Sequence, residues 1–346
     1  MSGPTRTRSR KLWRVMIAGL IVAVAAFAWR RAGMLGLPSV PADLTPEAAG
    51  LAGLEHMAQL NSLLWSESST NAGMQNPPLL SPGAALVQRG LAAHRRSDTH
   101  SALNNMRQGI RLEPQNLVLA NAYRMVVFAL RRDFLASARK ESVSVATFPP
   151  ELDGQPIRFF EELDQQHPSR ETKLHLALAW VDEMLLFPAL EIKAPASVQA
   201  VNLLTESIEG GNANHVPALF ARGLNHLHRP ARLVWPESTK TPRDAAAQDL
   251  GRCVAIGRQL GVGSVRLQAT LAMNLGDAYV KAGRTSLARS WWQIAQNLCR
   301  DDAVQSAIRR RYGWRDEEIL DRLETELDRG RAELAQPMTD LALMWN

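Results

Sequence analysis

Histidines come closest, among the side chains of this 346-residue sequence, to a pattern that could bind a metal. His226 and His228 stand two apart in the segment NHLHRP, and His215 precedes them, so three imidazoles fall within fourteen residues. Imidazole nitrogens bind zinc, but residues two apart on a helix do not share a face, so joint binding would require the turn to unwind. We therefore expect no metal site, and keep a metal-binding or enzymatic helical domain using residues 215–228 as an alternative.

Neighbouring acids are the other candidates for chemistry. Asp182 and Glu183 are adjacent, and adjacent residues on a helix point apart, which does not suit general acid–base catalysis. The sequence holds no G-x-S-x-G, H-E-x-x-H, Walker-type or G-x-G-x-x-G motif. Cys253 and Cys299 stand at apolar positions of predicted helices and outside any C-x-x-C motif, which favours small buried side chains. We expect neither catalytic residues nor a cofactor.

Composition favours a helical chain, and the distribution of charge gives no support to nucleic-acid binding. Apolar residues make up 46% of the sequence, with Ala and Leu prominent, which is typical of helices with a packed core. The net charge is +6, but residues 1–31 hold seven basic residues and no acid. The rest of the chain therefore has 33 basic and 34 acidic residues, so the charge marks the N-terminus rather than a nucleic-acid surface.

The N-terminal segment predicts a membrane anchor. Residues 12–29 form an 18-residue apolar span, interrupted only by Arg14 and bracketed by Trp13 and Trp29. Five basic residues precede the uncharged run 15–29 and two follow it, which places residues 1–11 in the cytoplasm and the rest beyond a bacterial inner membrane, in the periplasm. A cleaved signal peptide, with residues 26–28 as an A-x-A site, is the alternative.

Beyond the anchor, a Pro-containing tether over residues 30–48 leads to a helical domain over residues 49–313. A helix is expected to begin at Pro46, because proline suits the first helical turn. Small residues then recur where two helices would pack closely. Gly90 is followed by Ala102 after twelve residues and by Pro114 after twelve more. The segment LGDAYVKAG repeats the spacing and places five residues in the same register: Gly276, Tyr279, Ala288, Trp292 and Ala295.

This register resembles the tetratricopeptide repeat superfamily, in patches over residues 83–305. The resemblance implies a right-handed α-solenoid whose concave surface receives a peptide or helix of another protein, with no catalytic residues. Two middle helix pairs are stretched: Ala179 and Ala200 lie 21 residues apart, and Gly223 and Ala246 lie 23 apart. The Pro-interrupted inserts 187–197 and 229–242 are predicted to be loops.

Residues 314–346 form a charged amphipathic helix, over 315–335, and an apolar tail. The helix suits a cap on the last repeat, because terminal repeats need a polar outer face. The tail, 338–345, is apolar enough to pack back on the domain or to bind another molecule.

The partner expected from these features is an envelope protein or peptide segment, with the lipid bilayer contacted by residues 12–29 and no nucleic acid. Trp291 is predicted to be more exposed than Trp292, and it could anchor a partner, as could Trp235 in its Pro-flanked insert. The resemblance adds Asn225, Asn274 and Lys281 as contacts on the concave surface. A structural subunit of a membrane complex is the alternative, and it would present a large apolar patch.

Overall fold

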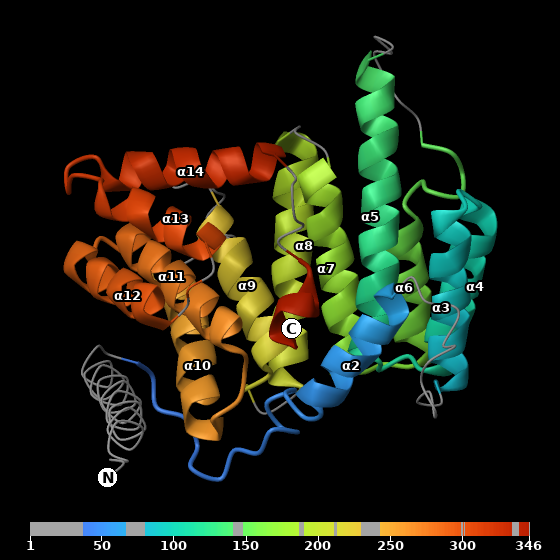
Figure 1. Cartoon of the computed structure of the whole chain (residues 1–346), viewed down its shortest axis with the longest axis horizontal. Helices are drawn as coiled ribbons and strands as arrows, with labels where there is room; N and C mark the ends of the chain where they lie inside the picture. Colours follow the sequence, from blue (N-terminus) through green and yellow to red (C-terminus); the bar gives the residue numbers. More distant parts are fainter. Residues whose placement is uncertain are drawn as a thin grey trace, which may run out of the picture.

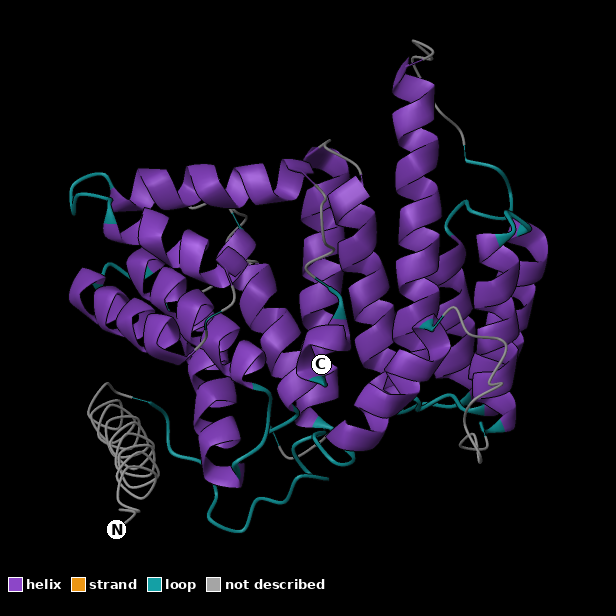
Figure 2. Ribbon diagram, in the orientation of Figure 1, coloured by secondary structure: helices purple, strands orange, loops and turns teal. Residues whose placement is uncertain are grey.

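The computed structural model describes residues 37–66, 80–140, 148–186, 190–210, 213–229, 243–298, 300, 302–333 and 339–345. The predicted membrane span 12–29 and Trp235 lie outside these residues, as does Cys299. Within the described ranges, no helix has both the length and the apolar character that a membrane crossing requires. The predicted all-α class is confirmed there, because thirteen α-helices and a short 3₁₀ helix are present and no strand is (Figure 2).

The helices stand side by side in a long row, with α14 laid across one end (Figure 1). Their bounds are α2 Leu54–Trp65, α3 Pro82–Arg95, α4 Thr99–Leu112, α5 Leu117–Lys140, α6 Gln155–Gln166, α7 Arg170–Leu186, α8 Leu190–Glu209, α9 Val216–His228, α10 Ala245–Leu260, α11 Val265–Lys281, α12 Thr285–Leu298, α13 Asp302–Tyr312, α14 Ile319–Glu333 and η2 Leu341–Met344. The most extensive contacts join α3 with α4, α7 with α8, α9 with α10, and α11 with α12, so the row is built from packed helical hairpins.

The two outer hairpins pack closely at glycine. A Cβ atom on Gly90 would lie 2.4 Å from Cγ of Met106 and 2.8 Å from the carbonyl oxygen of Ala102 on the facing helix. A Cβ atom on Gly276 would lie 2.5 Å from the Trp292 ring. Real Cβ atoms essentially never approach so closely, so both positions require glycine for the helix axes to come this near.

The middle hairpins differ from the predicted ones at their inserts. The prediction of a loop over 187–197 is wrong from Leu190 onward, because α8 begins there and contains Pro195. Pro195 lies close to the helix N-terminus, where the missing N–H removes one helical hydrogen bond and leaves the rest of the helix intact. Residues 230–242 of the other insert lie outside the described residues.

The chain before α2 packs against the domain instead of continuing a helix from Pro46. Gly50 and Gly53 both adopt φ of 68°, a left-handed conformation that ends the turn begun at residue 46 and delays α2 until Leu54. The main-chain N–H of Val216 donates to the carbonyl of Ala49 (2.9 Å), and Arg170 donates to the carbonyls of residues 47 and 48. Residues 37–49 therefore form a strap held against α7, α9 and α10, and this part of the predicted tether is fixed.

Two helices close the row at its far end. The predicted amphipathic segment forms α14, and its apolar stripe is buried at Ile319, Leu323 and Leu327, while Leu320 is exposed. Between it and α12 lies α13, a helix that the repeat register does not predict. Together they cover the last hairpin, as a terminal cap must do for a row of repeats.

Candidate functional site

The C-terminal segment, residues 339–345, returns to the centre of the row (Figure 1). Its 3₁₀ helix contacts α5, α11 and α2, and hydrogen bonds join the segment to α7 as well. We call the surface of these four helices under the segment the tail site. The tail site thus brings together helices from both halves of the chain, and a segment more than 200 residues away from α5 covers it.

A buried ion pair forms the floor of the tail site. The guanidinium of Arg124 on α5 donates to both carboxylate oxygens of Asp182 on α7, at 2.9 and 3.1 Å, and the two residues are 1% and 3% exposed. Burial raises the pKa of Asp182, and the charge of Arg124 and the hydroxyl of Thr339 oppose that shift. Two turns further along α5, Arg131 forms another ion pair with Glu183 of α7.

Side chains of α5 form hydrogen bonds with the main chain of the segment. Arg124 donates through Nη1 and Nη2 to the carbonyl of Thr339, both at 3.2 Å. Asn121 accepts from the main-chain N–H of Leu341 (3.0 Å) and donates to the Asp340 carboxylate (2.8 Å). The Thr339 hydroxyl donates to Asp182. A short stretch of chain is therefore held through its backbone, which is how a protein can bind peptides with limited dependence on their side chains.

Three apolar side chains of the segment are buried, at Leu341 (1% exposed), Met344 (1%) and Trp345 (6%). Their burial contributes roughly 5–9 kcal/mol. Ordering the backbone of seven residues costs roughly 7–14 kcal/mol, and the hydrogen bonds return about 1 kcal/mol each. The favourable and unfavourable contributions are of similar size.

A second buried ion pair lies at the capped end. Asp277 on α11 accepts from Arg311 on α13 at 2.7 Å through each carboxylate oxygen, and from the indole N–H of Trp292 at 2.9 Å. The Arg311 guanidinium also lies 5.7 Å from the Trp314 ring centroid. These contacts join α11, α12 and α13, so this pair fastens the cap to the last hairpin.

The residues predicted to contact a partner do not share one surface. Trp291 is 1% exposed, so the prediction that it is exposed is wrong: it faces an apolar cavity that side chains of α10 and α11 also line. Asn225 is buried and accepts from the Ser197 hydroxyl (3.0 Å). Lys281 binds the Arg229 carbonyl (2.6 Å) and Glu324 of α14 (2.8 Å). Asn274 is partly exposed on α11.

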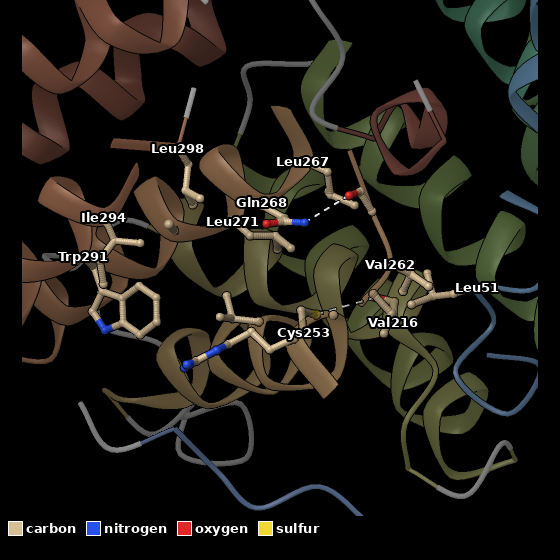
Figure 3. Close-up of a pocket in the computed structure, with 15 residues that line it drawn as sticks. Leu51, Val216, Cys253, Val262, Leu267, Gln268, Leu271, Trp291, Ile294 and Leu298 are labelled. Atoms are coloured by element: carbon tan, nitrogen blue, oxygen red, sulfur yellow. Dashed lines mark hydrogen bonds between the residues drawn. The ribbon is translucent and has the colours of Figure 1, made fainter. Parts of the chain in front are cut away.

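An apolar cavity of about 30 Å³ lies beside Trp291. Figure 3 shows Trp291, Ile294 and Leu298 of α12 on one side of it, and Cys253 towards the other. Space for one or two water molecules is too little for an organic ligand. Burial raises the pKa of the Cys253 thiol well above its ordinary value, so the thiol remains protonated. We find no reactive site here.

A larger cavity, of about 480 Å³, opens between α8, α9, α10 and α11 beside Pro38. Three arginines line it, but so do three acids, and Arg222 is bound to Asp249 at 2.8 and 2.9 Å. Arg252 donates to the side-chain oxygen of Asn214. Because the charges balance, the cavity selects neither anions nor cations.

Among the histidines of residues 215–228, His215 is buried, whereas His226 and His228 are partly exposed. Burial lowers the pKa of His215 to about 3 and that of His226 to about 3, with Arg170 and Arg229 adding to the respective shifts. His215 Nδ1 lies 3.2 Å from the Ser207 hydroxyl. The pKa of His175, which stacks on Phe160, is lowered well below its usual value by burial and by the charge of Arg124. In the part of the chain that is described, no three His, Cys, Asp or Glu side chains gather to hold a metal.

Comparison with models of known protein families gives no match, and no curated protein matches the sequence. The residues of the tail site therefore rest on geometry alone. The sequence carries one signal for them: Asn121 and Arg124 are polar, share a helix face, and interrupt the apolar run of residues 117–130. A charge in such a run is usually paired and buried, but its partner on α7 cannot be read from the sequence.

Proposed function

We propose that the protein is a membrane-anchored, tetratricopeptide-like scaffold that binds a segment of another bacterial envelope protein, and that the tail site is its binding surface. The observation that carries the proposal is the hold of Asn121 and Arg124 on the main chain of residues 339–341. The anchor is residues 12–29, and the proposal assigns no catalytic residue.

The distribution of exposed apolar side chains supports a scaffold over a permanent structural subunit. Among the described residues, the large exposed ones are Trp65, Leu112, Val265 and Leu320, and they belong to four different helices. A subunit buried permanently in a complex would present them as one contiguous patch. Scattered single residues are ordinary for a surface that binds partners transiently.

Photo-crosslinking in intact membranes of the native host tests the proposal. A photoreactive residue replaces Asn274, which is partly exposed on α11, a helix that contacts the tail segment. The matched control carries it at Leu112, which is exposed at the end of α4. We expect one envelope protein to be crosslinked at 274 and not at 112, and a synthetic peptide covering its crosslinked segment to bind the purified chain. Equal labelling at both positions, or none, would contradict the proposal.

A further inference from the structure

We infer that residues 339–345 are a displaceable resident ligand of the tail site, and that the partner segment recognised there carries the same chemistry. That chemistry is a hydroxyl residue, then an acid, then a run of apolar side chains that begins with a single 3₁₀ turn. The inference rests on the proposed function, because it names the kind of segment that the scaffold would bind.

The polar contacts of the tail site are hydrogen bonds to three consecutive residues of the segment. The carbonyl of Thr339 accepts from Arg124, the carboxylate of Asp340 accepts from Asn121, and the N–H of Leu341 donates to Asn121. Asp340 also caps the following turn by accepting from the N–H of Ala342 (2.9 Å). An acid at this position therefore serves both the tail site and the conformation of the segment.

The apolar half places its side chains at helical spacing. Leu341, Met344 and Trp345 are buried, whereas Ala342 and Leu343 between them are partly exposed. In the 3₁₀ helix Leu341–Met344, the side chains of Leu341 and Met344 share one face because they are three residues apart, and Trp345 follows as the C-cap residue. The run 341–345 is therefore apolar throughout, with three side chains in the hydrophobic core and two packed against it.

The tail site keeps its shape when the segment leaves. Arg124 and Asp182 bind each other through two hydrogen bonds, so neither charge depends on the segment for a partner. A preformed and self-satisfied surface binds with little reorganisation.

The test uses the full chain in detergent, intact and with residues 339–346 removed by a stop codon. The probe is a fluorescein-labelled peptide of residues 336–346, followed by anisotropy. We expect micromolar binding to the truncated chain, and at least tenfold weaker binding to the intact chain, whose tethered tail competes at high effective concentration. Replacing Leu341 by Asp in the peptide, or Asn121→Ala in the truncated chain, should weaken binding at least tenfold. Leu112→Ala, an exposed control, should not change it.

Two results would overturn the inference: no peptide binding to a truncated chain that retains its helical circular dichroism, or equal binding to both chains. If the truncated chain does not fold, hydrogen exchange in the intact chain decides. Exchange of the Leu341 amide at least a hundredfold faster than the amides of α7 supports a displaceable segment, and exchange at the same rate overturns it. Peptide binding without a crosslinked envelope protein would support a displaceable segment but remove the proposed function, and with it the chemistry inferred for the partner. A crosslinked partner without peptide binding would support the proposed function and overturn this inference.

Discussion

The centre of the row and its capped end each contain a buried arginine that binds both oxygens of an aspartate, and they differ in what completes the site. At the capped end, Asp277 binds Arg311 and Trp292, which both belong to helices packed on α11. In the centre, the Arg124–Asp182 pair is completed by Thr339, from a segment of seven residues. The same ion pair is therefore part of a permanent joint in one place and of an exchangeable contact in the other.

The largest effect should come from the permanent joint. Arg311→Met leaves Asp277 charged and buried without its cation, which should lower the free energy of unfolding by about 3–5 kcal/mol. Urea unfolding followed by circular dichroism measures the loss. Arg310→Met is the matched control, because Arg310 on the same helix binds Glu326 near the surface and should contribute less than about 1 kcal/mol. Equal losses in both variants would show that the Arg311 pair is not a joint.

As the pH falls, the centre of the row should lose stability at a higher pH than the capped end. His215 and His226 have pKa values of about 3 in the fold, so below pH 6.5 the unfolded chain takes up protons that the folded chain refuses. At pH 5 each histidine should lower stability by about 2 kcal/mol, since 1.5 pH units correspond to about 1.36 kcal/mol each. The raised pKa of Asp182 acts in the opposite sense, because the folded chain then binds protons more readily.

Hydrogen exchange at pH 7.5 and pH 5 measures this difference by region. Residues 245–333 contain no histidine, so α10 to α13 should keep their protection relative to α7 and α9. His175 also has a lowered pKa, so His226→Gln should remove about a third of the acid sensitivity. A uniform loss of protection along the row would contradict the assignment to the buried histidines.

The central ion pair should be less costly to break than the one at the cap. Arg124→Met leaves Asp182 with the Thr339 hydroxyl, and water can reach it whenever the segment leaves, so we expect a loss of about 1–3 kcal/mol. The sharper measurement is a double-mutant cycle with the truncated chain, in which the cost of Arg124→Met should become smaller. A cost as large as that of Arg311→Met would erase the contrast between the two sites.

Removing residues 339–346 should have the smallest effect. Burial and ordering of the segment nearly cancel, so thermal unfolding should report a change below about 2 kcal/mol with helicity unchanged. Leu323→Ala, which truncates a fully buried side chain of the cap helix α14, should cost more, about 2–5 kcal/mol. If truncation proves the more damaging change, the segment is part of the core.

The sequence predicts the helical class and the outer hairpins because their signal is local. Gly90 and Gly276 face larger residues twelve to sixteen positions away, a distance that one helical hairpin covers. The strap before α2 escapes prediction because Gly50 turns left-handed only where it meets His215, 165 residues later. The tail site escapes it for the same reason, since Asn121 and Asp340 are joined only by the assembled row. Contacts between residues that lie far apart in the sequence can be identified only once the fold is known.

The strap also limits the distance between the domain and the membrane. With residues 12–29 as the proposed anchor and the chain fixed against α10 from residue 37, seven residues, 30–36, separate the bilayer from the domain. Even fully extended, they reach at most about 25 Å, at 3.3–3.6 Å per residue. The domain would then stay close to the bilayer, and it could bind only those segments of a partner that lie near the membrane surface.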